Sequence, residues 1–188
     1  MNDVLGPWVK IGLPVLLAEG HGKSLVQQQF LNPKTSTIHD FTFFGQSHGC
    51  IAFALTEDSE VIAVRQYKQG CDCITLELPA GTANSNKESP EETIRRELLE
   101  ETGFEPKTIV SLNPSQFLAT RSSSVRVHFF LATGCRKVRD PLFDPDEEIV
   151  VELFTVPAWI RCCEEEIFDS STITATFKAL RRLGYLHL

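Results

Sequence analysis

Three glutamates in the middle of the chain have the spacing of a metal-binding helix face. Glu97, Glu100 and Glu101 stand at positions i, i+3 and i+4, so a helix through them places three carboxylates on one side within about one turn. Carboxylates this close repel one another unless a hard divalent cation lies among them. Mg²⁺ and Mn²⁺ prefer such oxygen ligands and also bind phosphates. The same spacing occurs on ordinary solvated helix faces, so the neighbouring residues must decide between the two interpretations.

The segment around these glutamates carries clear helix signals. Ser89 is a suitable N-cap, and Glu92 lies three residues later, as a capping box requires. Gly103 is a natural helix stop. Ile94 and Leu98 are four residues apart, roughly opposite the acidic face. The pattern predicts a two-faced helix that begins just after Ser89 and ends just before Gly103.

The residues from Glu88 to Phe104 resemble the signature of the Nudix hydrolases. That signature runs Gly, five residues, Glu, seven residues, Arg-Glu, an aliphatic residue, any residue, Glu-Glu, any residue, Gly, and then an apolar residue. The chain matches it in full from Glu88 onwards. One departure precedes the match, because six residues instead of five separate Gly81 from Glu88. The departure concerns the loop and leaves the helix unchanged.

The resemblance implies roles for individual residues. In the family, an ion pair, here Glu88 with Arg96, braces the loop against the helix. The residues 78–81 read Leu-Pro-Ala-Gly, which resembles the ADP-ribose pyrophosphatase branch, where the carbonyl at Ala80 is a further metal ligand. The resemblance implies Mg²⁺ (or Mn²⁺) as the cofactor. The implied metal carboxylates are Glu97, Glu100 and Glu101, of which Glu97 and Glu101 are also the implied catalytic residues.

Two further features resemble parts that contact the substrate in this branch. The strand expected over 61–68 usually carries an arginine where this chain has Lys68, which can meet a phosphate only as a point charge. Arg65, on the same strand, is a second expected substrate contact. Trp8 is expected to stack on a base, with core packing as the alternative.

The loop that follows the signature differs from that of ADP-ribose-selective members. Those enzymes carry a proline sixteen residues beyond the signature, where this chain has Thr120. Proline would stiffen the loop, so its absence predicts a less selective pocket. The neighbouring Arg121 either pairs with a substrate phosphate or lies in solvent.

A second acidic cluster precedes the apolar run 149–156. In the branch, a glutamate of this loop acts as general base or completes the metal site. Glu147 aligns best with that residue, and Glu148 is the alternate. An exposed polar loop is the other interpretation of these acids.

Composition excludes several classes of function. The chain has 188 residues, 42% of them hydrophobic, which suits one well-buried domain. The formal net charge of −7 and the scattered basic residues argue against nucleic-acid binding. The N-terminus resembles neither a signal peptide nor a membrane span, so we expect a cytoplasmic protein. The six cysteines show no zinc or redox spacing and are expected to be free thiols.

Hydrophobic periodicity places strands and helices along the whole chain. We expect an α+β protein, and the resemblance implies the Nudix fold, an α/β/α sandwich with a mixed sheet, over 46–188. Residues 1–45 are expected to form a small N-terminal β-sheet that makes a homodimer. Strands are expected near 8–17, 23–30, 37–44, 49–56, 60–68, 74–81, 107–112, 125–133 and 148–156, and later helices near 157–166 and 171–183.

The resemblance implies a Mg²⁺-dependent hydrolase that cleaves the diphosphate of a nucleoside diphosphate linked to a sugar. Its products are a nucleoside monophosphate and a sugar phosphate. The alternatives are a Nudix hydrolase for another nucleotide, such as a dinucleotide or an oxidised triphosphate, and a catalytically silent nucleotide-binding module. Loss of a signature carboxylate would favour the silent module, and this chain has lost none.

Overall fold

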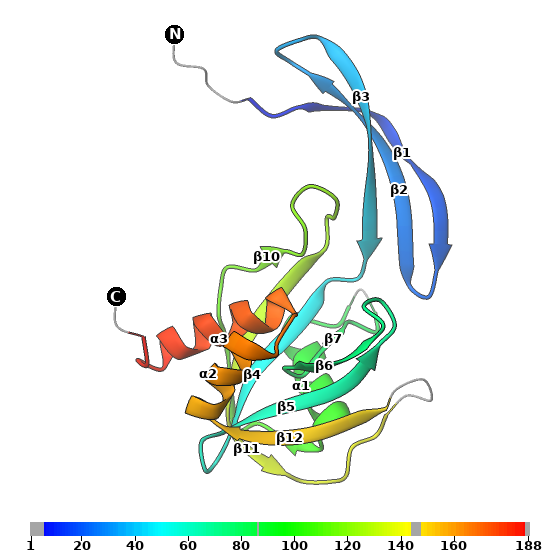
Figure 1. Ribbon diagram of the computed structural model, residues 1–188. Coiled ribbons are helices and arrows are strands. Elements are labelled where there is room, and N and C mark those ends of the chain that lie inside the picture. Colours follow the sequence, from blue (N-terminus) through cyan, green and yellow to red (C-terminus); the bar gives the residue numbers. More distant parts are fainter. Residues whose placement is uncertain (1–5, 86, 144–147, 187–188) are drawn as a thin grey trace. The chain divides into compact units, whose positions relative to one another are not determined.

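The computed structural model describes residues 6–85, 87–143 and 148–186 (Figure 1). Most elements lie where the sequence predicts them, and the strands expected near 49–56 and 60–68 pair with each other as an antiparallel hairpin. The elements are β1 (Val9–Gly20), β2 (Lys23–Asn32), β3 (Thr37–Gln46), β4 (Gly49–Thr56), β5 (Glu60–Lys68), β6 (Cys73–Glu77), β7 (Ala80–Thr82), α1 (Pro90–Thr102), β8 (Phe104–Glu105), β9 (Thr108–Ser111), β10 (Gln116–Phe117), β11 (Arg126–Lys137), β12 (Ile149–Thr155), α2 (Val156–Glu165) and α3 (Ser170–Arg182).

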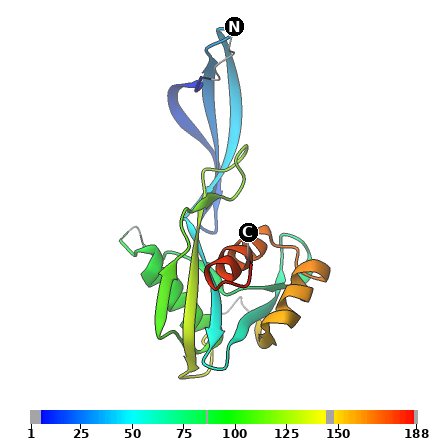
Figure 2. The ribbon, with the colours of Figure 1, turned by 90° about the vertical axis from the view of Figure 1, so that its left-hand side faces the viewer.

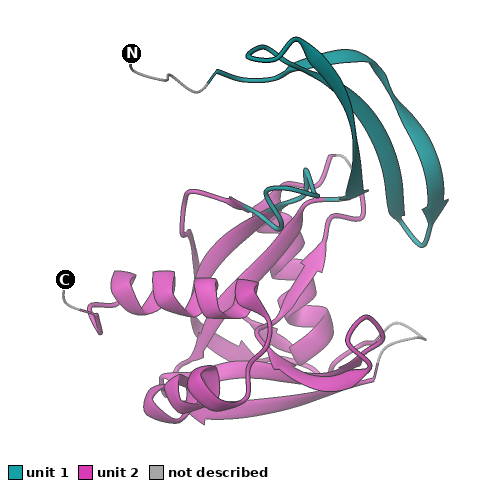
Figure 3. Ribbon diagram, turned by 45° about the horizontal axis from the view of Figure 1, so that its top comes forward, with its two compact units in different colours: residues 1–47, 117–126 teal, residues 48–116, 127–188 magenta. Residues whose placement is uncertain are grey.

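The chain divides into two compact units (Figure 3). Unit 1 comprises residues 1–47 and 117–126, and unit 2 comprises 48–116 and 127–188. The segment 117–126 joins unit 1 through backbone pairing, because Phe44 N donates to Ser122 O at 2.8 Å and the Ser123 hydroxyl donates to Phe44 O at 3.0 Å. The sequence predicts this segment as part of the region 46–188.

Unit 1 is built on a three-stranded antiparallel sheet in the order β1-β2-β3. Aromatic rings gather on it with centroids 5.6 to 6.3 Å apart. These rings belong to Trp8, Phe30, Phe41 and Phe43. Large apolar side chains of β1 remain exposed, and Leu13 is the extreme case at 88%.

Unit 2 contains a mixed sheet whose main path runs β10-β11-β4-β5-β12. Strands β4 and β11 are parallel, whereas β5 pairs antiparallel with both β4 and β12. Both faces of β4 are buried, which is why its sequence is almost continuously apolar. No helix among the described residues is long and apolar enough to cross a bilayer.

Alternate residues of β4 belong to two separate cores. On one face, Ile51, Phe53 and Leu55 pack in the core that includes Trp159 of α2 and Leu180 of α3. On the other face, β4 contributes Cys50, Ala52 and Ala54 to the core that contains Ile94 and Leu98 of α1. Helix α1 therefore covers one side of the sheet and α2 and α3 the other, as Figures 1 and 2 show. This arrangement confirms the α/β/α sandwich.

The predicted bounds of α1 are confirmed by its caps. The Ser89 side chain accepts from the Glu92 N–H, and the Glu92 side chain accepts from the Ser89 N–H, which completes the capping box. Gly103 ends the helix with φ of 75°, and its N–H donates to Leu99 O. A Cβ at Gly103 would lie 2.1 Å from the Arg139 carbonyl oxygen, so this stop requires glycine for space as well as for φ.

The segment 74–81 is two strands, so the prediction of one continuous strand is wrong. β6 pairs with β5, whereas β7 pairs with β4. Between them Pro79 has no N–H to donate, and its carbonyl accepts from Ala52 N at 3.0 Å. The change of partner strand carries Ala80 and Gly81 towards α1.

Candidate active site

A cavity of about 460 Å³ in unit 2 lies where β7 meets the acidic face of α1. The four residues proposed as metal ligands, including the one from β7, all line it. The lining residues are Ala80, Gly81, Thr82 and Asn84, then Arg96, Glu97, Glu100 and Glu101 of α1, and Arg139, Leu142 and Phe143. The fold thus assembles acidic, basic and backbone groups from three segments into one site.

Gly81 allows the backbone of β7 to approach the Glu97 carboxylate closely. A Cβ at this position would lie 2.0 Å from the carboxyl carbon of Glu97 and 2.1 Å from one of its oxygens. Contacts that short are forbidden, so any other residue would push the carboxylate away. Gly81 therefore lies close to the acidic face of the helix, although the loop that follows it has one residue more than the signature.

Glu101 is buried and faces the start of β7. Its Oε2 accepts a hydrogen bond from the Ala80 N–H at 3.0 Å, and the residue is only 6% exposed. A buried carboxylate is tolerated only where hydrogen bonds or charges compensate its lost hydration. The bond holds Glu101 beside the backbone of Ala80, whose carbonyl was the fourth proposed ligand.

Arg96 connects the loop before α1 to the carboxylates of the helix. Its Nε lies 2.9 Å from Glu88 Oε1, and its Nη2 donates to Thr82 O at 2.9 Å. Its Nη1 lies 2.9 Å from Glu97 and 2.8 Å from Glu100. The expected ion pair between Glu88 and Arg96 is thus present. The contacts with Glu97 and Glu100 were not foreseen from the sequence.

We expect Glu88→Gln to destabilise the fold in a pH-dependent way. The Arg96 guanidinium and the Asn84 N–H hold the pKa of the Glu88 carboxyl below its ordinary value. The pair therefore stabilises the fold above the unfolded-state pKa of about 4.3, and this contribution is lost as the pH falls through the lower folded-state pKa. We expect a loss of about 1–2 kcal/mol in unfolding free energy at pH 7, measured by urea denaturation.

A matched control for this variant is Glu91→Gln, which removes an exposed ion pair with Arg95 on the same helix. It is expected to change stability little, because exposed pairs contribute little. The deficit of Glu88→Gln should shrink as the pH falls below about 4 and vanish below the folded-state pKa of Glu88. A deficit that persists unchanged at low pH would contradict the assigned role of the ion pair.

The chemistry of the site suits a hard divalent cation. Three carboxylates and backbone carbonyls are all oxygen ligands, and the three negative charges outnumber the two positive charges of Arg96 and Arg139. Within the described ranges, however, no three His, Cys, Asp or Glu side chains are arranged to hold a metal ion. Glu97 and Glu100 face Arg96, and Glu101 faces the Ala80 N–H. These oxygen donors are of the kind that a hard divalent cation prefers. In the structure they contact Arg96 and the Ala80 N–H.

The segment after β11 supplies site residues that were not predicted from the sequence. Arg139, Leu142 and Phe143 line the cavity, and Leu142 N donates to Glu100 O at 2.8 Å. The Arg139 Nε is buried and has no hydrogen-bond partner among the described residues. A guanidinium group that lines this cavity is suited to an anionic ligand. No motif marks these residues, so the sequence offered no signal for them.

Cys50 lies close to the site but is not a candidate nucleophile. Burial, followed by the nearby Glu97 and Glu88 carboxylates, raises the pKa of its thiol to about 12. The thiolate, which is the reactive form of cysteine, is therefore scarce at neutral pH. All six cysteines are free thiols, as predicted.

The proposed general bases lie just before β12. Glu147 falls outside the described residues. Glu148 is exposed and immediately precedes β12, which pairs along its whole length with β5.

Two predicted substrate contacts on β5 engage acidic side chains instead of lining the cavity. Arg65 Nε lies 2.7 Å from Glu152 Oε1, and its Nη1 also pairs with Glu166. Lys68 Nζ donates to Gln66 Oε1 and lies 3.8 Å from Glu77 Oε2. A substrate contact by Arg65 would compete with its two ion pairs, and this role stays a prediction.

The other two predicted substrate contacts come together in unit 1. Trp8 and Arg121 both line an apolar hollow of about 280 Å³, together with Phe30, Phe41 and Phe43. The aromatic lining suits a planar group, and Arg121 adds a positive charge at its edge. Their contact with substrate also stays a prediction.

Comparisons with known proteins agree with this architecture. Residues 46–166 match the NUDIX domain. The chain is 29% identical over 130 residues to the ADP-ribose pyrophosphatase of Bacillus subtilis (strain 168), covering 68% of this chain and 69% of that protein. It is 31% identical over 133 residues to the methanol dehydrogenase activator of Bacillus methanolicus, with the same coverage.

A solved structure shares the fold over nearly the whole chain. The crystal structure of an ADP compounds hydrolase superposes with a TM-score of 0.83 at 16% identity, covering 98% of this chain and 100% of that one. The domain match includes β7, the acidic helix α1 and the segment after β11, whose residues line the candidate site. The chain therefore belongs to the family of Nudix pyrophosphohydrolases.

Proposed function

We propose that this protein hydrolyses the diphosphate bond of a nucleoside diphosphate linked to a sugar, with Mg²⁺ as its cofactor. The products are a nucleoside monophosphate and a sugar phosphate. The observation that carries the proposal is one cavity that is lined by Ala80, Glu97, Glu100 and Glu101. The absence of a Cβ at Gly81 leaves space for the Glu97 carboxylate there. The relative named as an ADP-ribose pyrophosphatase supports the choice of substrate class.

Each group around the cavity has a distinct part in this proposal. Glu97, Glu100 and Glu101 would hold Mg²⁺ with the Ala80 carbonyl. When bound, the cation offsets the charge of the diphosphate and makes water more acidic. Arg96 spaces and orients two of the carboxylates, and the guanidinium of Arg139, which lines the cavity, would bind a phosphate oxygen. Either Glu147 or Glu148 would accept the proton of the attacking water.

We expect the enzyme to accept several nucleoside diphosphate sugars. Thr120 lies in an exposed turn where ADP-ribose-selective members carry proline, so this loop lacks a stiffening residue. ADP-ribose should be preferred at most about tenfold in kcat/KM, equivalent to about 1.4 kcal/mol of transition-state binding. Chromatographic assays with Mg²⁺ and with EDTA should compare ADP-ribose, ADP-glucose, GDP-mannose, a reduced dinucleotide and an oxidised guanine triphosphate.

A preference for ADP-ribose of about a hundredfold would contradict the predicted loose selectivity. Activity confined to the dinucleotide or to the triphosphate would favour the alternative of a Nudix hydrolase for another nucleotide. No turnover of any compound, with nucleotide binding retained, would favour a silent binding module.

We further propose that unit 1 mediates a homodimer. Exposed apolar side chains on β1 provide a surface that a second copy of the chain would cover; they include Leu13, Val15, Leu16 and Leu17. Light scattering at tens of micromolar should give twice the mass of one chain. We expect Leu13→Asp to yield a monomer, because it places a charge in the proposed interface. Phe168→Asp, at an exposed apolar residue of unit 2, should leave the dimer intact. A wild-type monomer would contradict the proposal.

A further inference from the structure

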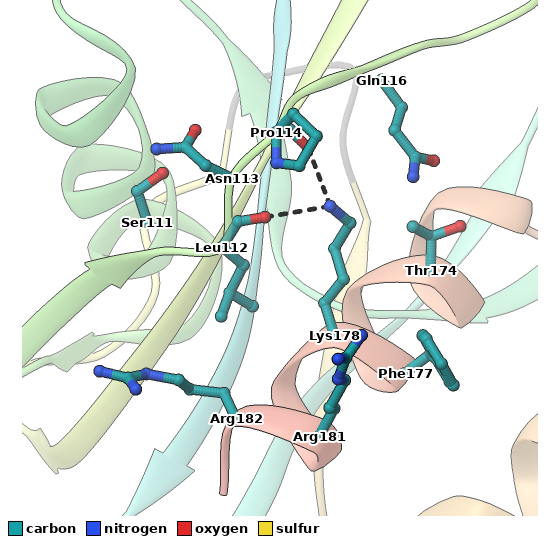
Figure 4. A pocket seen from close by; sticks show the side chains of 10 residues that line it. All are labelled: Ser111, Leu112, Asn113, Pro114, Gln116, Thr174, Phe177, Lys178, Arg181 and Arg182. Atoms are coloured by element: carbon teal, nitrogen blue, oxygen red, sulfur yellow. Dashed lines mark hydrogen bonds between the residues drawn. The ribbon is translucent and has the colours of Figure 1, made fainter. Parts of the chain in front are cut away.

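A second cavity of unit 2 lies between α3 and the loop that follows β9. Its volume is about 730 Å³, within the range of small-molecule sites. Figure 4 shows that one wall is formed by side chains of α3 and the other by the loop residues 111–116. Helix α3 packs on the face of the sheet opposite to α1, so this cavity is separate from the candidate active site.

The wall formed by α3 is strongly basic. Lys178, Arg181 and Arg182 stand at i, i+3 and i+4 and all line the cavity. No acidic residue lines it, although the chain as a whole carries a net charge of −7. None of the three cations makes an ion pair with an acid in the described part of the chain. The cavity is therefore a site of local positive charge.

Lys178 is held at the cavity without being neutralised. Its ammonium donates to Leu112 O at 3.1 Å and to Pro114 O at 2.8 Å, as Figure 4 shows, and it lies 5.0 Å from the centroid of the Phe129 ring. Carbonyl and ring contacts orient the ammonium but remove none of its charge. Partial burial lowers the pKa of this group. An anion in the cavity would compensate a charge that the protein leaves uncompensated.

The helix dipole accounts for only part of this pattern. Basic residues in the last turn of α3 are favourable because the carbonyl end of a helix is negative, and Arg181 and Arg182 lie there. The dipole does not explain why Lys178, one turn earlier, reaches across to the loop. It also does not explain an exposed aromatic ring beside the cations. Phe177 lines the cavity and is 50% exposed, one turn before Arg181.

We propose that this cavity binds a nucleoside phosphate. The phosphate would lie against Arg181 and Arg182, and the base against Phe177. The opposite wall offers polar groups for the sugar and the base, from Ser111, Asn113 and Gln116. The site is independent of the proposed hydrolytic reaction, because none of its residues lines the active-site cavity.

The test is the binding of AMP to the intact chain, measured by isothermal titration calorimetry with EDTA present. We expect saturable binding that Arg181→Gln/Arg182→Gln weakens at least about tenfold, since two charge-assisted contacts are lost. Arg161→Gln, at an exposed arginine of α2 outside the cavity, is the matched control and should leave binding unchanged. Both arginines of α3 are exposed, so the double variant should remain folded and retain the wild-type hydrolytic rate.

Further measurements separate this site from the active site. Glu101→Gln should bind AMP like the wild type, and Phe177→Ala should weaken AMP binding but not the binding of inorganic phosphate. Loss of AMP binding in Glu101→Gln but not in the double arginine variant would overturn the proposal. Equal affinities for AMP and inorganic phosphate, or no saturable AMP binding up to about 1 mM, would overturn it as well.

Discussion

Glu101→Gln is expected to lower kcat by at least about a hundredfold while leaving the fold intact. The substitution is nearly isosteric. In the wild type, Glu101 Oε2 accepts a hydrogen bond from the Ala80 N–H at 3.0 Å, and the amide oxygen of glutamine can accept the same bond. What it removes is one negative charge from a buried position in the cavity. The proposed reaction needs that charge to hold Mg²⁺, so turnover should fall while the melting temperature changes little.

The measurement is steady-state turnover of the best substrate at saturating Mg²⁺, together with a thermal unfolding scan. Glu91→Gln is the matched control, because it neutralises an exposed glutamate of the same helix that does not line the cavity. Wild-type turnover in Glu101→Gln would show that the metal assignment is wrong. Loss of the folded state would show instead that the charge of Glu101 is needed for stability.

Gly81→Ala is expected to reduce kcat/KM by about 10- to 100-fold, because displacement of a reacting group by about 1 Å can cost two orders of magnitude. The added Cβ would lie 2.0 Å from the carboxyl carbon of Glu97, so this carboxylate must move. It is the end of a flexible side chain, and it can move without displacing the backbone of α1. Thermal stability should therefore change much less than activity.

A double-mutant cycle tests this explanation directly. If Gly81→Ala acts by moving the Glu97 carboxylate, it should have little further effect in a Glu97→Gln background, so the two changes should not be additive. Gly70→Ala is the matched control, because a Cβ at Gly70 meets nothing within 4 Å. Additive losses would point to a disturbed β7 backbone as the cause.

Local features of the sequence determined the acidic helix and its two faces. The capping box of Ser89 and Glu92 and the stop at Gly103 define the bounds of α1. The spacing of Ile94 and Leu98 predicts the side that packs on the sheet, where both are fully buried. These signals act between residues at most four positions apart, so they can be recognised in the sequence without knowledge of the fold. The Nudix signature can be recognised in the same way, because its match is one continuous stretch from Glu88 to Phe104.

Only the tertiary structure decided what faces that helix. Ala80 contacts Glu101, which lies 21 positions later in the sequence. The contact forms because β6 pairs with β5, whereas the next strand, β7, pairs with β4. Arg65 pairs with Glu152 and Glu166, about a hundred positions away, although its sequence context resembles a substrate strand. Strand partners are selected by the burial and hydrogen bonding of the whole sheet, which no short segment encodes. The sequence by itself therefore determined the chemical groups on α1, and strand pairing decided which distant groups surround them.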